Sequence, residues 1–191
     1  MNLLRTCTAA SLCLASLGLS SCLNAPDYPD TPAIDFKSLT LARNKPAQVG
    51  FTEIDTIKFA LDFRDGDGDL GLSDEDIKVA PWNATTGGPN NRGYSYNFFI
   101  KTYKKAKGSG NFVEFINQGG RAGEYDGQFP RLDEVDARPA PIKGTLNFKH
   151  VLPLEGINYF PGDVLKFELS IMDRALHQSN TVMTTEVTLG Q

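Results

Sequence analysis

Apolar and polar side chains alternate through most of this chain, and that period of two constrains the fold more than any other feature. The clearest example is residues 57–63, which read IKFALDF. Successive side chains of a strand point to opposite faces, so this pattern is typical of a strand with one buried face. No segment after the N-terminal region shows a convincing helical period. The sequence therefore predicts an all-β fold.

Further segments carry the same signal. They are 94–103 (YSYNFFIKTY), 112–116 after the turn sequence KKAKGSGN, 146–148, 165–171 and 181–189. About seven strands separated by turn signals predict a single antiparallel β-sandwich of immunoglobulin or fibronectin type III kind, over residues 34–191. The chain lacks a Cys…Trp…Cys pattern, which excludes a true antibody-like domain but not this architecture. Two connections, 73–93 and 117–144, are long enough to be functional or poorly ordered.

The N-terminus predicts export and a lipid anchor. Residues 1–21 carry Arg5 and then an apolar stretch that is too short to span a bilayer, as in a secretory signal. The sequence LSSC, ending at Cys22, resembles a bacterial lipobox, whose cysteine thiol becomes the attachment point for acyl chains such as palmitate. The alternative is an ordinary signal with a chance cysteine. We expect lipidation at Cys22, which would bind the chain stably to a membrane.

Cysteine usage and charge narrow the possibilities further. Cys7 and Cys13 fall inside the signal and Cys22 would carry lipid, so no thiol would remain for disulfides, zinc or catalysis. The Pro- and Asp-rich residues 22–33 are expected to form a semi-rigid tether. Of 19 basic and 23 acidic residues, loss of Arg5 would leave 18 basic ones and a charge of −5. This balance argues against a nucleic-acid partner.

Residues 64–71, RDGDGDLG, form the strongest candidate site. Asp65, Asp67 and Asp69 occupy the first, third and fifth positions of an EF-hand loop, whose oxygen ligands suit calcium. The match then fails, because Leu70 replaces the required glycine and Asp76 the final glutamate. Two interpretations stay open: a calcium loop of another scaffold, or Asp-Gly turns with solvated carboxylates.

Topology adds candidate ligands to this loop. In a seven-strand sandwich, the loop after the second strand and the loop before the last strand emerge at the same end. The second of these reads MDRALHQSN, so Asp173 and Asn180 are expected near the aspartates, with Asp74 or Asp76 completing the shell. We therefore predict a structural calcium ion, which would stiffen the junction between tether and domain.

A family resemblance rests on four stretches: the lipobox, PDYPDTPAIDF, FALDFRDGDGDLG and LSIMDRALHQSNTVMTTEVTL. Together they resemble small surface lipoproteins of the Bacteroidota, which combine a proline-rich tether, an F-x-D-x-D-G-D-[LI]-G loop and a final hairpin with D-x-x-x-x-x-S-N. The resemblance implies an Ig-like domain on the outer membrane and a calcium loop at Asp65, Asp67 and Asp69, with no assigned activity. Acids directly after the cysteine are typical of surface export in that group. Here residues 23–25 intervene, so both a periplasmic and an external face are compatible with the sequence.

Three functions follow from these observations. The first is a lipid-anchored binding or structural module with an unknown protein or glycan partner, and not an enzyme. The second is a glycan-binding lipoprotein of a polysaccharide-uptake system, with Trp82 stacking on sugar rings. The third is a hydrolase using paired carboxylates. Its acids would come from the 117–144 connection: Glu124, Asp126, Asp133, Glu134 and Asp136. A solvated acidic loop explains these residues more simply.

Overall fold

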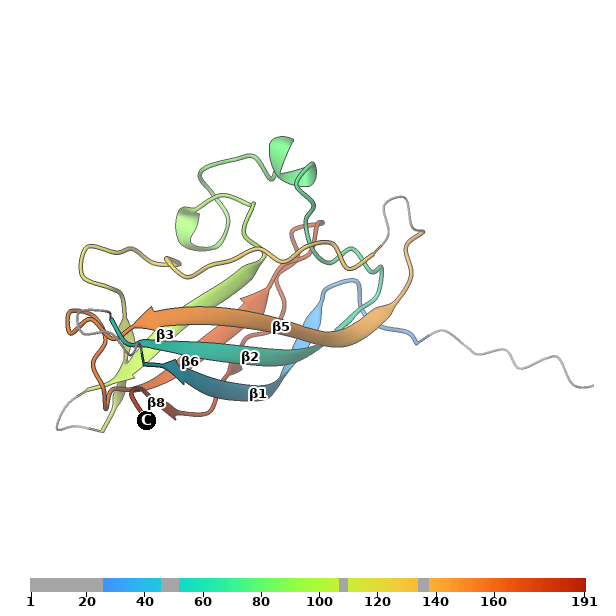
Figure 1. Ribbon diagram of the computed structural model, residues 1–191. Coiled ribbons are helices and arrows are strands. Elements are labelled where there is room, and N and C mark those ends of the chain that lie inside the picture. The colour runs from blue at the N-terminus through green and yellow to red at the C-terminus, as the bar shows by residue number, and fades with distance from the viewer. Residues whose placement is uncertain (1–25, 46–51, 107–109, 134–137) are drawn as a thin grey trace, which may run out of the picture.

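The chain forms an all-β sandwich of two antiparallel sheets, in a computed structural model that describes residues 26–45, 52–106, 110–133 and 138–191. The first sheet has the order β1 (Ala33–Asn44), β2 (Ile54–Asp65), β5 (Ile142–Pro153). The second has the order β4 (Phe112–Phe115), β3 (Phe98–Lys105), β6 (Val164–Ile171), β7 (Val182–Met183), and β8 (Val187–Thr188) also pairs with β6. Figure 1 shows β5, β2 and β1 side by side in front of β3, β6 and β8. The predicted fold class is thereby confirmed.

The core lies between the two sheets and follows the period of two. Ile57, Phe59 and Leu61 of β2 are at most 1% exposed and face the second sheet. The ring of Phe59 meets that of Phe167 on β6 edge-on, with centroids 5.1 Å apart. The Phe98 and Phe148 rings stack at 4.4 Å and join β3 to β5. Burial of these large apolar side chains is the main force that holds the sheets together, since the described residues include no disulfide.

Two of the predicted strands differ in extent from the structure. The strand expected from residue 94 begins at Phe98, because the Asn97 side chain donates to and accepts from the backbone of Phe129 (3.1 and 2.8 Å). The expected final strand, 181–189, is split into β7 and β8. Between them the Thr184 hydroxyl, instead of a backbone carbonyl, accepts the N–H of Phe167 at 3.0 Å, which interrupts the ladder.

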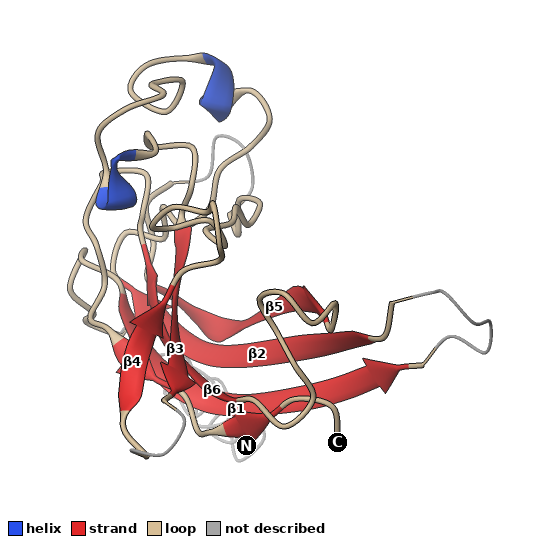
Figure 2. Cartoon of the chain, turned by 90° about the vertical axis from the view of Figure 1, so that its left-hand side faces the viewer, coloured by secondary structure: helices blue, strands red, loops and turns tan. Residues whose placement is uncertain are grey.

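The long connections gather beyond one end of the sheets, where Figure 2 shows the two short helices above the strands. The connection after β2 contains the 3₁₀ turns η1 (Asp76–Lys78) and η2 (Pro89–Asn91). No helix in the described part of the chain is long and apolar enough to cross a membrane. The predicted signal segment, Cys22 and residues 23–25 of the tether lie outside the described residues.

The end of β2 and the end of β6 meet, as the sandwich topology predicts. Leu70, in the loop after β2, forms an isolated antiparallel bridge with Asp173, just beyond β6. The start of the described chain lies at this same end, where the N–H of Gly66 donates to the carbonyl of Pro29 at 2.9 Å. The C-terminus lies at the opposite end of the sandwich (Figure 1).

Candidate metal centre

Asp65 is the last residue of β2, and its side chain is buried completely. The residue is 0% exposed, because it occupies an inward-facing position of the strand that continues the row of Ile57, Phe59 and Leu61. Its Oδ2 accepts the N–H of Asp69 at 3.1 Å, while its Oδ1 is buried and has no hydrogen-bond partner among the described residues. A buried carboxylate oxygen without a partner is costly unless a cation compensates for it.

The loop after Asp65 turns back sharply and brings Asp69 toward the same point. Gly68 and Gly71 adopt positive φ angles of 75° and 89°, which favour glycine. A Cβ on Gly71 would also collide with the carbonyl of Pro130. The Oδ2 of Asp69 accepts the N–H of Ala175 at 3.0 Å, and its buried Oδ1 is unpartnered within the described chain.

Asp173 completes the group from the loop after β6 and is 3% exposed. Its Oδ1 accepts the backbone N–H of His177 at 2.7 Å, and its Oδ2 lies 3.0 Å from Nδ1 of the same residue. His177 therefore orients this carboxylate from the outside, where the imidazole stays half exposed. The D-x-x-x-H spacing of Asp173 and His177 is the sequence signal for this contact, which was not among the predictions.

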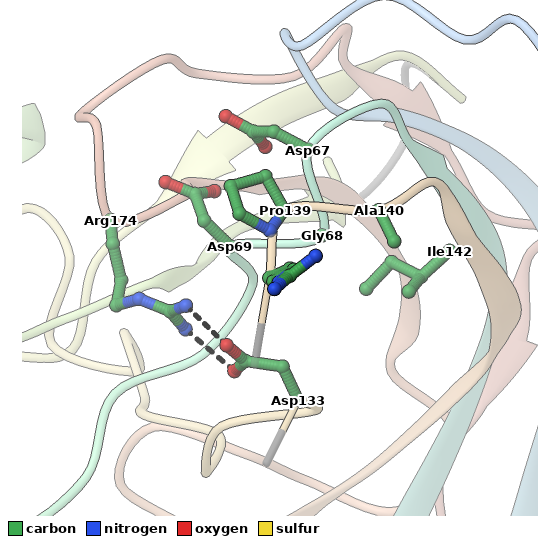
Figure 3. Close-up of a pocket in the computed structure, with 9 residues that line it drawn as sticks. Asp67, Gly68, Asp69, Asp133, Pro139, Ala140, Ile142 and Arg174 are labelled. Atoms are coloured by element: carbon green, nitrogen blue, oxygen red, sulfur yellow. Dashed lines mark hydrogen bonds and ion pairs between the residues drawn. The ribbon is translucent and has the colours of Figure 1, made fainter. Parts of the chain in front are cut away.

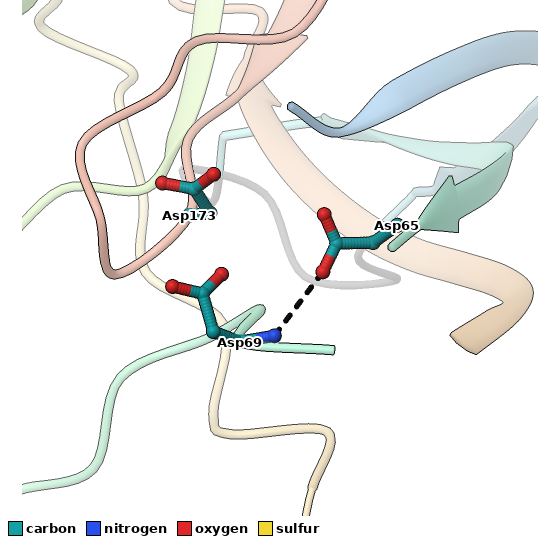
Figure 4. Close-up of side chains that lie close together, drawn as sticks. All are labelled: Asp65, Asp69 and Asp173. Carbon is teal, nitrogen blue, oxygen red and sulfur yellow. Dashed lines mark hydrogen bonds between the residues drawn. The ribbon is translucent and has the colours of Figure 1, made fainter. Parts of the chain in front are cut away.

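Asp65, Asp69 and Asp173 point toward a common centre, as Figure 4 shows. Each offers a carboxylate oxygen, and these oxygens all lie within 4.8 Å of one another. Calcium binds oxygens at about 2.3–2.6 Å, so ligands on opposite sides of one ion are about 5 Å apart. The spacing fits calcium, and three carboxylates are hard ligands of the kind it prefers.

The electrostatics of the group favour a bound cation. Burial, reinforced by Asp67, Asp69 and Asp173, raises the pKa of Asp65 to about 7. Burial and the carboxylates of Asp173 and Asp67 likewise raise the pKa of Asp69 to about 6, against the opposing effect of Arg174. Burial also raises the pKa of Asp173, although its hydrogen bonds to His177 oppose the change. A divalent cation would remove the repulsion that produces these shifts.

Asp67 lies at the margin of the group. Its charge raises the pKa of Asp65 and Asp69, and its Oδ1 is buried without a partner among the described residues. Asp67 and Asp69 also line a cavity of about 270 Å³. Arg174 and Asp133 line the same cavity and form an ion pair with two hydrogen bonds of 3.0 and 2.6 Å (Figure 3).

The other predicted ligands have different positions in the structure, and these assignments require correction. Asp74 is exposed. Asp76 forms two charged hydrogen bonds with Arg131 (2.7 and 2.6 Å), which hold its pKa well below the usual range. Asn180 uses both side-chain groups on the backbone of Ile34: its Oδ1 accepts the N–H at 2.8 Å, and its Nδ2 donates to the carbonyl at 2.9 Å. Asp76 and Asn180 therefore hold loops in place and are not part of the carboxylate group.

The described acidic residues of the 117–144 connection likewise form hydrogen bonds or ion pairs within the fold. Glu124 accepts the N–H of Asn117 at 2.8 Å, and Asp126 accepts from Asn90 at 2.9 Å. Asp133 is held by Arg174, from which it is separated by 41 positions in the chain. Glu134 and Asp136 lie outside the described residues. The insertion thus offers no free pair of carboxylates in its described part.

Trp82 lies in the connection after η1 and is partly buried, with a buried Nε1 that has no partner in the described chain. Its polar edge therefore faces inward, and stacking of the Trp82 ring on sugars stays a prediction.

Comparison with family models, curated proteins and solved structures finds no match to this chain.

Proposed function

We propose that this chain is a lipid-anchored cell-envelope protein whose β-sandwich is a binding or structural module, stabilised by one calcium ion. The lipid would be attached at Cys22, and the ion would be bound by Asp65, Asp69 and Asp173, with Asp67 at its margin. The proposal follows the resemblance to small lipoproteins of the Bacteroidota outer membrane. It includes no catalytic step.

The observation that carries the calcium site is the complete burial of Asp65 with an unpartnered oxygen. Asp69 and Asp173 each have a carboxylate oxygen within 4.8 Å of an Asp65 oxygen, and no lysine or arginine forms an ion pair with any of the three in the described chain. A group of buried like charges destabilises the folded state unless a cation joins it.

The site also contacts the segment that leads to the anchor. Gly66, the residue after Asp65, donates its N–H to Pro29, and Asn180 holds both backbone groups of Ile34. A calcium ion that fixes the Asp65–Asp69 loop would therefore also fix where the tether leaves the domain. Such a brace would set the angle between domain and membrane.

Thermal unfolding tests the calcium site directly. The protein is treated with chelator and then titrated with calcium or magnesium. At calcium 100-fold above the dissociation constant, the folded state should gain about 2.7 kcal/mol, or roughly 5–10 °C in melting temperature for a domain of this size. Magnesium should give a smaller gain, because it prefers a tighter octahedral shell. An unchanged melting temperature would contradict the site.

The anchor has an independent test. Intact mass of the membrane-extracted protein should show the chain starting at Cys22 with added acyl chains. Cys22→Ala should abolish the added mass and release the protein from the membrane fraction. Its calcium response should persist, so the two halves of the proposal can fail separately.

A further inference from the structure

The outer face of the first sheet, formed by β1, β2 and β5, differs in charge from the rest of the molecule. Its side chains alternate in register with the buried row of β2 and point away from the core. The small ones are Ala33, Ser38, Thr40, Ala42, Thr56, Ala60 and Thr145. The charged ones are Lys37, Lys58, Arg64, Lys143 and Lys149, with Asp35 and Asp62. Five cations thus oppose two carboxylates, an excess of three positive charges on a chain whose formal net charge is −4.

Both carboxylates of this face are already neutralised. Arg64 bonds Asp35 at 2.6 Å, and Lys37 bonds Asp62 at 2.9 Å. Lys58, Lys143 and Lys149 form no ion pair with any described residue and are exposed. The excess charge therefore resides on these three lysines.

The strand register places cations directly opposite one another. Lys58 on β2 pairs with Lys149 on β5, and Arg64 pairs with Lys143. Like charges at paired positions of neighbouring strands destabilise a sheet. Lysines on β5 could serve to protect an edge strand from aggregation, but Lys58 lies on the central strand, where edge protection does not apply.

A shallow hollow of about 440 Å³ lies at the tether end of this face. Its lining comprises Arg64, Lys143, Asp62, Phe63, Gly144, Thr145 and Tyr28 of the tether. Arg64 is paired with Asp35 and Asp62 with Lys37, so Lys143 is the cation of this hollow that forms no ion pair with a described residue. Its ammonium group can form a charged hydrogen bond with a phosphate group.

We infer that the outer face of the β1-β2-β5 sheet, with the Arg64–Lys143 hollow at its tether end, binds the phosphate groups of anionic lipids. The inference rests on the proposed lipid anchor, which would hold the domain beside a bilayer through a tether entering at the hollow. The positive excess of this face is complementary to anionic headgroups. The domain would then rest on the membrane through this sheet, with the rest of its acidic surface turned away.

Lysine footprinting of the lipidated protein in vesicles tests this orientation. The protein is reconstituted in phosphatidylcholine alone or with 30% phosphatidylglycerol, and then acetylated with a soluble active ester. Anionic lipid should slow acetylation of Lys58, Lys143 and Lys149 by about threefold or more, while Lys78 and Lys105 keep their rates. The protection should fade toward 1 M salt, where the Debye length falls to about 3 Å.

A charge-removing variant provides the second measurement. In the wild type, anionic vesicles should slow hydrogen exchange of the backbone amides in residues 142–153. In the triple variant Lys58→Gln/Lys143→Gln/Lys149→Gln, this protection should be lost. The matched control Lys78→Gln/Lys105→Gln should keep that protection.

Two outcomes would overturn the inference: equal acetylation rates in both vesicle types, or protection by a soluble acidic polysaccharide without protection by anionic vesicles. Intact mass, read on the same sample, reports separately whether the lipid anchor is present.

Discussion

Asp55 and Asp65 lie on the same strand, ten positions apart, and both are 0% exposed, yet the structure treats them differently. At one end of the sandwich, Asp55 accepts the N–H of Gly190 at 2.6 Å. Its Oδ1, which like that of Asp65 has no hydrogen-bond partner among the described residues, lies 4.0 Å from the guanidinium of Arg43. At the other end, Asp65 lies among carboxylates and forms no ion pair among the described residues.

The two ends of the sandwich differ in how the charge of the buried carboxylate is compensated. The Asp55 end carries its own cation, which also bonds Glu53 and the carbonyl of Gly190. The stability of that end should therefore not depend on the calcium concentration. At the Asp65 end, no lysine or arginine among the described residues forms an ion pair with Asp65, Asp69 or Asp173, so the stability of this end should depend on calcium and on pH.

The largest expected effect comes from removing the internal cation. Arg43→Ala would leave Asp55 buried without its counter-charge, and removing one partner of a buried pair typically costs about 3–5 kcal/mol. Urea unfolding should show this loss equally with calcium and with chelator. Arg64→Ala, which breaks the exposed pair with Asp35, is the matched control and should cost less than about 1 kcal/mol. A small effect of Arg43→Ala would mean that the two ends do not differ as described.

Substitution at the other end should remove the calcium response. Asp65→Asn keeps the shape of the side chain but deletes a charge from the carboxylate group. The calcium-induced gain of about 2.7 kcal/mol at 100-fold excess should vanish, while stability in chelator at pH 8 stays equal or rises. Asp62→Asn, on the outer face of the same strand, should retain the full response. A calcium response in Asp65→Asn equal to that of the wild type would exclude this site.

In chelator, pH should act on the Asp65 end with a defined sign. The folded-state pKa values of Asp65 (about 7) and Asp69 (about 6) lie above the reference value of 3.8. Their contribution is therefore fully present below about pH 4 and is lost as the pH rises through 7. His150, which is partly buried, acts in the opposite direction, because loss of solvation lowers its pKa to about 4 and stability falls as the pH drops below 6.5.

Comparison of wild type with Asp65→Asn cancels the His150 contribution. Between pH 5 and pH 8 the wild type should lose on the order of 2 kcal/mol more than the variant. Saturating calcium should abolish this difference. Parallel pH profiles in chelator would show that Asp65 does not have a raised pKa.

The smallest expected effect is that of Asn180→Ala, which tests whether the Asn180 side chain only holds the backbone of Ile34 or also binds the metal. Asn180→Ala removes both hydrogen bonds to Ile34 and should cost about 1–2 kcal/mol, while calorimetry gives an unchanged calcium affinity. Asn147→Ala, at an exposed position of β5, should change neither. A tenfold loss of calcium affinity in Asn180→Ala would restore Asn180 as a ligand.

Much of the fold could be predicted because its signals are local. The row Ile57, Phe59, Leu61 identified a half-buried strand, and the same alternation identified β3, β5 and β6. The prediction failed where a side chain replaces the backbone in hydrogen bonding. Asn97 delays the start of β3, and Thr184 divides the final strand, and neither effect changes the pattern of apolar residues.

The candidate site was predictable only in part. Asp65, Asp67 and Asp69 share one loop, and the sandwich topology brings Asp173 to the same end. The partners of Asp76 and Asn180 were not predictable, since Arg131 and Ile34 reach them through the path of distant loops. The same holds for the opposition of Lys58 and Lys149, which depends on the register between β2 and β5.

The sequence by itself determined that this chain forms a two-layer β-sandwich and that its second strand ends in a glycine-rich aspartate loop. Both follow from side-chain alternation and turn chemistry, which act between neighbours in the chain. Only the tertiary structure decided which buried aspartate has its own counter-charge and which lacks one. That choice depends on long-range packing, because a cation compensates a carboxylate only when the fold brings the two within a few ångströms.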